Sequence, residues 1–236
     1  MEKFLEKTAG HLQQLRPRLW TLNFILICLS TLTIFLTFHG LNPILPLYIE
    51  KFGGTKLAGL AMASLTLAAI MARPVAGWAV DKYGRRAILS GGILLLLLPM
   101  VIYIQMVPVI LLIALRFIQG LGWGISHTAA GTVAADIVPR ERIGEGMGFY
   151  SLNTSISMAV APALALWLIE HYSFRELFMA CSLLVILSLS LAQFIRYPKI
   201  EKLSADSKFV LMEKSALRPA VVIFLVGFTY SAIISF

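Results

Sequence analysis

The sequence predicts an all-α protein that crosses a membrane several times, and three observations support this prediction. The 236 residues are 58% hydrophobic and only 14% charged, and the mean hydropathy is +0.84. Soluble domains are about 45–50% apolar and about 25% charged, because a soluble core cannot bury much more apolar surface. Apolar runs of roughly 20 residues, enough to span a bilayer as a helix, recur along the chain. We therefore expect a polytopic bundle of six helices followed by a truncated seventh.

Polar breaks between the apolar runs place each helix in turn. Charges are costly within the hydrocarbon core, and proline interrupts the helical hydrogen-bond ladder, so both mark the ends of spans. The expected helices cover about residues 20–39 (with an irregular extension to 48), 57–80, 87–106, 109–135, 145–169 and 174–195. A seventh helix begins near residue 219 and is still apolar at residue 236.

These elements group into four parts. They are a cytoplasmic N-terminal lead (1–18), a six-helix bundle (19–196), a central cytoplasmic linker (197–217) and the start of the seventh helix (218–236). The lead lacks the continuous apolar stretch and cleavage site of a signal peptide. Since the sequence stops inside an apolar run, we expect a longer natural chain whose C-terminal bundle is missing here.

The distribution of basic residues predicts the orientation in the membrane. The net charge is +8, but the lysines and arginines punctuate the apolar runs, which argues against a nucleic-acid partner. With a cytoplasmic N-terminus, the cytoplasmic segments hold fifteen basic residues and the outside loops hold three. The positive-inside rule therefore predicts a multi-pass protein of the cell membrane with its N-terminus in the cytoplasm.

Other classes of membrane protein find less support in the residues. An intramembrane enzyme needs a catalytic or metal-binding constellation, and no paired intramembrane carboxylate is present. The two cysteines lie within apolar runs without metal-ligand spacing, and no glycine-rich phosphate loop occurs, so no cofactor is expected. A non-transporting seven-helix receptor or sensor stays open as an alternative, although such receptors have the opposite orientation.

The short loop between the second and third predicted helices carries the most specific motif. Gly84 permits a tight turn, and Gly77 is expected to let its helix approach a neighbour closely. Asp81 can lie against a helix N-terminus, and Asp136 is the expected partner of Arg85. The six specified positions are Gly77, Asp81, Lys82, Gly84, Arg85 and Arg86.

This loop resembles the G-x-x-x-D-[RK]-x-G-R-[RK] signature of the major facilitator superfamily. The resemblance implies that the first six spans form the N-terminal bundle of that fold. It also implies that the loop latches the two halves of a transporter in the outward-facing state, with Asp81 contacting a helix of the missing half. The alternative for Lys82, Arg85 and Arg86 is that they only fix the topology.

A second motif, Arg116-x-x-Gln119-Gly120, lies within the fourth predicted helix. It resembles the R-x-x-Q-G-x-G motif of the same family, especially of its drug/proton antiporter branch. The resemblance implies a role of the arginine in proton coupling. An arginine inside a bilayer costs at least ~2.5–3.5 kcal/mol, which argues for a buried partner or a wet cavity. The alternatives are a structural arginine bonded to Gln119, and glycines that serve close packing.

The resemblance is incomplete in the fifth and first helices. Drug antiporters carry a G-P-x-x-G-G motif where this sequence reads Ala161-Pro162-Ala163-Leu164-Ala165-Leu166, and no Asp or Glu lies deep in any complete span. The resemblance still implies a secondary active transporter that moves a small solute by alternating access, with proton-coupled efflux as the expected mode and the proton as coupling ion.

Polar positions on the first, fourth and fifth helices predict a substrate cavity. Polar side chains are tolerated in spans where they line water or protein, and positions four and seven residues apart share a helix face. The candidates are Asn23, Thr37, Trp123, His127, Tyr150, Asn153 and Ser157. Alternatively, His127 is a neutral side chain bonded to a neighbouring helix, and the hydroxyls bond their own backbone. The basic excess at mid-membrane mildly favours an anionic or zwitterionic substrate.

Overall fold

The computed structural model describes residues 17–53, 56–197 and 221–222. Six of its helices are long and apolar enough to cross a membrane, and the described residues contain no strand, which confirms the predicted all-α class. The helices are α2 (Leu22–Gly53), α3 (Lys56–Tyr83), α4 (Arg85–Tyr103), α5 (Val109–Ile137), α6 (Ile143–His171) and α7 (Phe174–Phe194), with a 3-10 turn at Arg140–Arg142. Most of the predicted lead, the linker and nearly all of the seventh helix lie outside the described residues.

The first span differs from its prediction at its C-terminal end. Helix α2 does not become irregular after residue 39 but continues through Pro43 and Pro46 to Gly53. Apolar residues on both sides of these prolines are buried, and the Tyr48 hydroxyl donates a hydrogen bond of 3.0 Å to the Val107 carbonyl. Packing against neighbouring helices therefore outweighs the local effect of two prolines.

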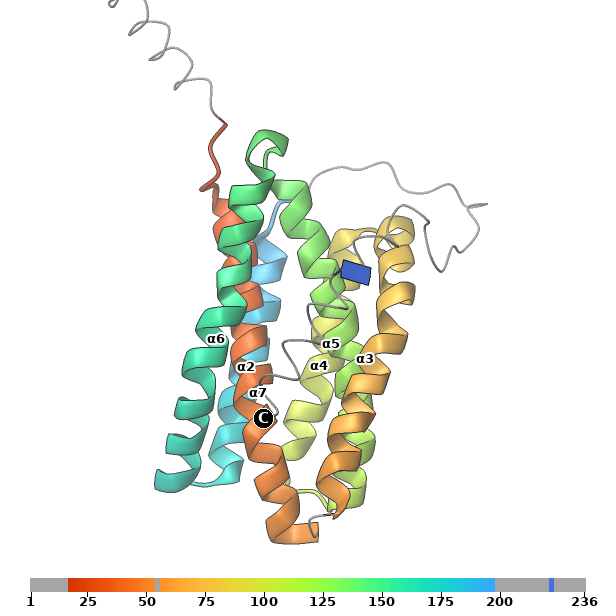
Figure 1. Ribbon diagram of the computed structural model, residues 1–236, viewed down its shortest axis with the longest axis vertical. Helices are drawn as coiled ribbons and strands as arrows, with labels where there is room; N and C mark the ends of the chain where they lie inside the picture. The colour runs from red at the N-terminus through yellow and green to blue at the C-terminus, as the bar shows by residue number, and fades with distance from the viewer. Residues whose placement is uncertain (1–16, 54–55, 198–220, 223–236) are drawn as a thin grey trace, which may run out of the picture. The chain divides into compact units, whose positions relative to one another are not determined.

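The helices form two layers (Figure 1). Helices α6, α2, α5 and α3 lie side by side in this order, and α7 and α4 lie behind them. The most extensive contacts join α3 to α5, α4 to α5, α2 to α6 and α2 to α7. Helices α2 and α5 are thus the central pair, and the polar positions predicted to line a cavity belong to them and to α6.

The neighbour pattern shows an internal repeat that is not obvious in the sequence. Exchanging α2, α3 and α4 with α5, α6 and α7 leaves the set of contacting helix pairs unchanged. Corresponding helices also begin at a nearly constant spacing, 87, 87 and 89 residues apart (22 to 109, 56 to 143 and 85 to 174). Each copy consists of three spans, an odd number. The second copy therefore runs through the membrane in the opposite direction to the first, as in inverted-repeat transporters.

Candidate functional site

The loop between α3 and α4 consists of one residue. Helix α3 ends at Tyr83 and α4 begins at Arg85, so the chain reverses at Gly84, whose φ is 100°. Backbone in this region strongly favours glycine, which confirms the tight turn predicted at this position. The close helix approach predicted at Gly77 involves none of the described helices, because a Cβ added there would meet nothing within 4 Å.

Arg85 joins three helices at this end of the bundle. Its Nε donates to Asp136 Oδ2 of α5 at 2.9 Å, and its Nη1 lies 2.9 Å from Asp81 Oδ1 of α3. The same nitrogen donates to the Val80 carbonyl at 3.2 Å. The predicted pairing of Arg85 with Asp136 is therefore present. The Arg85 side chain is only 12% exposed, whereas that of Asp81 is 47% exposed, so Asp81 presents a carboxylate that other groups can reach.

The two other cations of the loop have partners within this half of the fold. The Lys82 ammonium lies 4.6 Å from the centre of the Trp78 ring, a cation–π distance. Arg86 donates to Gln193 Oε1 of α7 at 2.8 Å, and Gln193 in turn donates to Ser90 of α4 at 2.8 Å. The contacts of Arg86 and Gln193 tie α4 to α7.

Tyr197 lies at the same end of the bundle, three residues after the end of α7. The Tyr197 hydroxyl donates to the Ala192 carbonyl at 2.8 Å. Burial raises the pKa of Tyr197 to about 12, against a smaller opposite effect of the nearby Arg86 guanidinium. The hydroxyl therefore stays a hydrogen-bond donor at neutral pH.

Arg116 is completely enclosed in the bundle and held by neutral groups. Its Nη1 donates to Gln119 Oε1 at 3.0 Å, and its Nη2 lies 3.4 Å from the sulfur of Met62 in α3. The Tyr103 hydroxyl of α4 donates to the same Gln119 oxygen at 3.4 Å. The Nε atom has no partner among the described residues. A buried cation without a carboxylate is costly. No motif or spacing in the sequence pointed to Met62 and Tyr103 as its neighbours.

The glycines of α5 bring it into backbone contact with α3 and α4. A Cβ on Gly124 would lie 2.7 Å from the Ala69 carbonyl oxygen, and one on Gly122 would lie 2.7 Å from the Leu96 amide nitrogen. A Cβ on Gly120 would collide with the backbone at Leu65. Close packing, the alternative given for these glycines, is therefore present in the structure.

The aromatic members of the predicted cavity pack between α2 and α5. The ring of Trp123 stacks on Phe38, with centroids 3.8 Å apart and planes at 10°. His127 lies edge-on to Phe35 at 5.6 Å and next to Trp123 at 5.5 Å. Trp123 is buried and His127 is partly exposed. Trp123 and His127, two of the predicted cavity residues, are therefore in contact with each other.

The hydroxyl and amide side chains of the predicted cavity bond mainly to groups of their own helix or of the adjacent helix. Thr37 donates to the Thr33 carbonyl at 3.0 Å and Ser157 to the Asn153 carbonyl at 2.6 Å, so both bond their own helix. Thr31 donates to the Tyr150 hydroxyl at 3.4 Å across α2 and α6. The buried amide of Asn153 interacts with the Cys28 thiol of α2, and its nitrogen makes no other hydrogen bond to the described residues.

Asn23 is separate from this group. Its side-chain oxygen accepts a hydrogen bond of 3.1 Å from the backbone N–H of Arg196, just beyond the end of α7. No group of three or more His, Cys, Asp or Glu that could hold a metal ion is found among the described residues.

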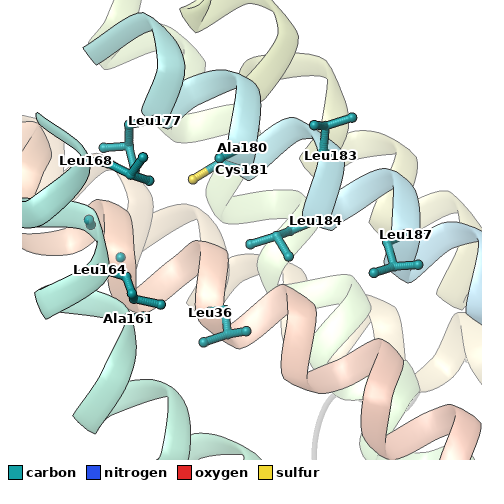
Figure 2. A pocket seen from close by; sticks show the side chains of 12 residues that line it. Leu36, Ala161, Leu164, Leu168, Leu177, Ala180, Cys181, Leu183, Leu184 and Leu187 are labelled. Atoms are coloured by element: carbon teal, nitrogen blue, oxygen red, sulfur yellow. The ribbon is translucent and has the colours of Figure 1, made fainter. Parts of the chain in front are cut away.

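A pocket of about 420 Å³ opens between α2, α6 and α7, away from the polar groups. Figure 2 shows leucines of all three helices around it, with the thiol of Cys181 among them. The lining includes Leu36 and Gly40 of α2, Leu164 and Leu168 of α6, and Cys181 and Leu184 of α7. It contains none of the predicted site residues, and its apolar lining suits hydrocarbon rather than a polar solute.

Comparisons with known proteins agree with this arrangement. The family model described as Major Facilitator Superfamily matches residues 27–236. The chain is 28% identical over 185 residues to the multidrug resistance protein B homolog of Mycobacterium tuberculosis, covering 78% of this chain and 34% of that protein. It is 25% identical over 182 residues to the multi-drug resistance efflux pump PmrA homolog of Lactococcus lactis, covering 73% and 44%. The chain therefore spans a third to a half of the length of these relatives.

Solved structures show the same fold at low identity. The human organic anion transporter MFSD10 superimposes with a TM-score of 0.67 at 16% identity, covering 77% of this chain and 49% of that one. A peptide transporter POT superimposes with a TM-score of 0.65 at 18% identity, covering 89% and 45%. In both cases, the described helices match about half of a longer helical chain.

Proposed function

Because the chain belongs to the Major Facilitator Superfamily, we propose that it forms part of a secondary active transporter that moves a small solute across the cell membrane by alternating access. The proposed mode is proton-coupled efflux, in keeping with relatives named as multidrug resistance and efflux proteins. In the proposed orientation the N-terminus and the Gly84 turn face the cytoplasm, which places the basic excess on that side.

The bridge made by Arg85 is the observation that best supports this function. Alternating access requires the two halves of the protein to separate at one end of the membrane and close at the other. Arg85 fixes α3, α4 and α5 as one unit at the Gly84 end, while it leaves Asp81 half exposed. The exposed carboxylate is then the group that binds the second half when this end is closed, and it releases that half when the end opens.

Arg116, Gln119 and Gly120 are the proposed coupling residues. The buried Arg116 carries a positive charge without a described carboxylate partner. A carboxylate of the second half, or a proton gained and lost near this charge, would change the electrostatic energy of the closed bundle strongly, because the surroundings are of low polarity. Gly120 keeps α5 against α3, so a change at Arg116 is passed directly to α3.

The proposed cavity lies between α2, α5 and α6. Asn153 offers a buried amide that contacts the weakly polar Cys28 thiol, and His127 offers a partly exposed ring. Trp123 and Tyr150 support these two from neighbouring turns. The hydroxyls of Thr37 and Ser157 already donate to carbonyls of their own helices, and Asn23 lies at the Gly84 end of the bundle. We therefore propose that these three residues contribute less to substrate binding than Asn153 and His127.

Transport by the full-length protein in proteoliposomes tests this proposal. A proton gradient is expected to drive accumulation of an anionic dye such as fluorescein, and Asp81→Asn is expected to lower the rate by about tenfold, because a charge-assisted contact of about 1.4 kcal/mol or more is lost. Glu141→Gln, an exposed change near the same end, is the matched control and should transport normally. Accumulation that ignores the gradient, or an unaffected Asp81→Asn variant, would contradict the proposal.

A further inference from the structure

Arg73 is a second arginine inside a span, and its surroundings differ from those of Arg116. It lies in α3 eight residues before Asp81, about 12 Å along the helix at 1.5 Å per residue. The side chain is exposed, and no hydrogen bond or ion pair is found for it among the residues of 17–53, 56–197 and 221–222. A guanidinium at this depth is costly in lipid, so it marks a polar partner or a water-filled cavity.

The position of Arg73 favours the cavity. The adjacent turn of α3 packs on α5, since a Cβ on Gly124 would touch Ala69 and Ala72. Arg73 lies within electrostatic range of His127, which is at a similar depth, nine residues before Asp136 in α5. Helices α3 and α5 belong to the layer whose front is seen in Figure 1, opposite the side covered by α4 and α7. Arg73 and His127 therefore share one part of that layer.

The charge balance of the described spans is positive at mid-membrane. Arg73 and Arg116 lie well inside their helices, whereas every described acidic residue lies in the first or last turns of a helix or in a connection. The acidic residues are Glu50, Asp81, Asp136, Glu141, Glu145, Glu170 and Glu176. Arg116 is enclosed by Gln119, Met62 and Tyr103, so Arg73 is the cation that a ligand can reach.

We infer that Arg73 of α3, together with His127 of the neighbouring helix α5, binds the anionic group of an organic anion and that this anion is the transported solute. The inference rests on the proposed function and names the class of its substrate. The guanidinium provides two parallel N–H donors for a carboxylate or sulfonate, and the partly exposed rings of Phe38, His39 and His127 offer an apolar surface for the rest of the molecule. A carboxylate of the second half is the competing source of negative charge.

Charge-selective cysteine labelling of the full-length protein tests the site without requiring transport. The reporter is Ile70→Cys, because Ile70 is 61% exposed and lies three residues before Arg73, where side chains are neighbours. Cys28 and Cys181 are replaced by alanine, as are cysteines elsewhere in the full chain. Reaction rates are then measured with an anionic and a cationic methanethiosulfonate, namely the sulfonatoethyl and trimethylammonioethyl reagents. Thr66→Cys, two turns away on the same side, is the second reporter.

If Arg73 faces an aqueous cavity with its charge unpaired, the rate ratio favours the anionic reagent. A unit charge about 6 Å away in water changes the ratio of the two rates by about tenfold. Arg73→Gln should remove this preference, Arg73→Lys should keep it, and Arg175→Gln, an exposed arginine at the other end of the bundle, should leave it unchanged. Naphthalene-1-sulfonate should slow labelling when Arg73 is present and not in Arg73→Gln, while a naphthylmethylammonium cation should not slow it.

Three results would overturn the inference. They are an absence of labelling at both reporters, a ratio that ignores Arg73→Gln, and labelling that naphthalene-1-sulfonate does not slow. A second-half carboxylate paired with Arg73 would give a low ratio in the unmodified protein and no sulfonate effect. The unmodified protein could instead show the expected labelling pattern but no gradient-driven transport. That result would contradict the proposed function and leave only an anion-binding site at Arg73.

Discussion

The two outer helices of the front layer occupy equivalent positions in the inverted repeat, yet they pack differently on the central pair. Helix α3 approaches α5 so closely that a Cβ on Gly124 would lie 2.7 Å from the Ala69 carbonyl oxygen. At Gly40, where α2 meets α6, the nearest atom to an added Cβ is the Ala161 carbonyl oxygen at 3.5 Å, an ordinary contact. The α2–α6–α7 side also contains the apolar pocket. The same topology therefore holds one tight and one loose interface.

This difference indicates where the half-bundle is rigid. Backbone contact between α3, α5 and α4 leaves no room for sliding, and the Arg85 bridge joins the same three helices. Helix α6 has mainly α2 as a neighbour, and 22% of its most apolar stretch is buried, close to the 28% of α3. The two helices therefore differ in how closely their backbones approach their neighbours, with contacts of an added Cβ at 2.7 Å for α3 and 3.5 Å for α6. We therefore expect α6 to move with less resistance than α3 when the halves of the transporter rock.

A pair of glycine substitutions is expected to give the largest difference between the two interfaces. Gly124→Ala forces the α3 backbone to shift and should destabilise the full-length protein by about 1–3 kcal/mol, as overpacked cores do. Gly40→Ala meets only van der Waals contacts and should stay within about 0.5 kcal/mol, since alanine also favours the helix. Unfolding by SDS of the reconstituted protein measures both. Equal losses would mean that the two interfaces are equally tight.

A buried serine pair tests how strongly the loose side is fixed to α7. Ser30 and Ser188 lie 2.9 Å apart between α2 and α7, and Ser188 also donates to the Ser30 carbonyl at 2.9 Å. Interhelical hydrogen bonds in membranes contribute about 0.6 kcal/mol on average, so Ser188→Ala should cost about that much in the same SDS assay. Ser190→Ala, whose hydroxyl bonds only its own helix, is the control. A loss well above 1–2 kcal/mol would show that α7 is held as firmly as α3.

The smallest effect is expected where extra volume is placed in the pocket. Ala180 lines it, so Ala180→Leu should change the unfolding free energy by less than about 0.5 kcal/mol, because the added methyl groups occupy space that is already open. Ala69→Leu places the same atoms against α5 and should destabilise by about 1–3 kcal/mol. If both variants lose the same stability, the pocket is not open in the membrane-embedded protein.

The sequence was informative wherever charge or glycine interrupts an apolar run. The six spans, the turn at Gly84 and the pairing of Arg85 with Asp136 were predicted because each has a local chemical reason. An irregular extension of the first span through Pro43 and Pro46 was predicted, but its regular helical geometry as far as Gly53 was missed, since it depends on packing against residues far along the chain. The same holds for Tyr103 and Met62 beside Arg116, and for the open surroundings of Gly77. Such contacts arise only from the arrangement of helices.

The junction at Gly84 has a consequence for how the protein is made. With a single residue between them, α3 and α4 cannot enter the bilayer as independent segments separated by a long tether. The pair must be inserted as one helical hairpin, with Lys82, Arg85 and Arg86 held back at its tip. A residue added at this junction would turn α4 by about 100° about its axis, so the biogenesis of the hairpin and the alignment of Arg85 with its two carboxylates depend on the same glycine.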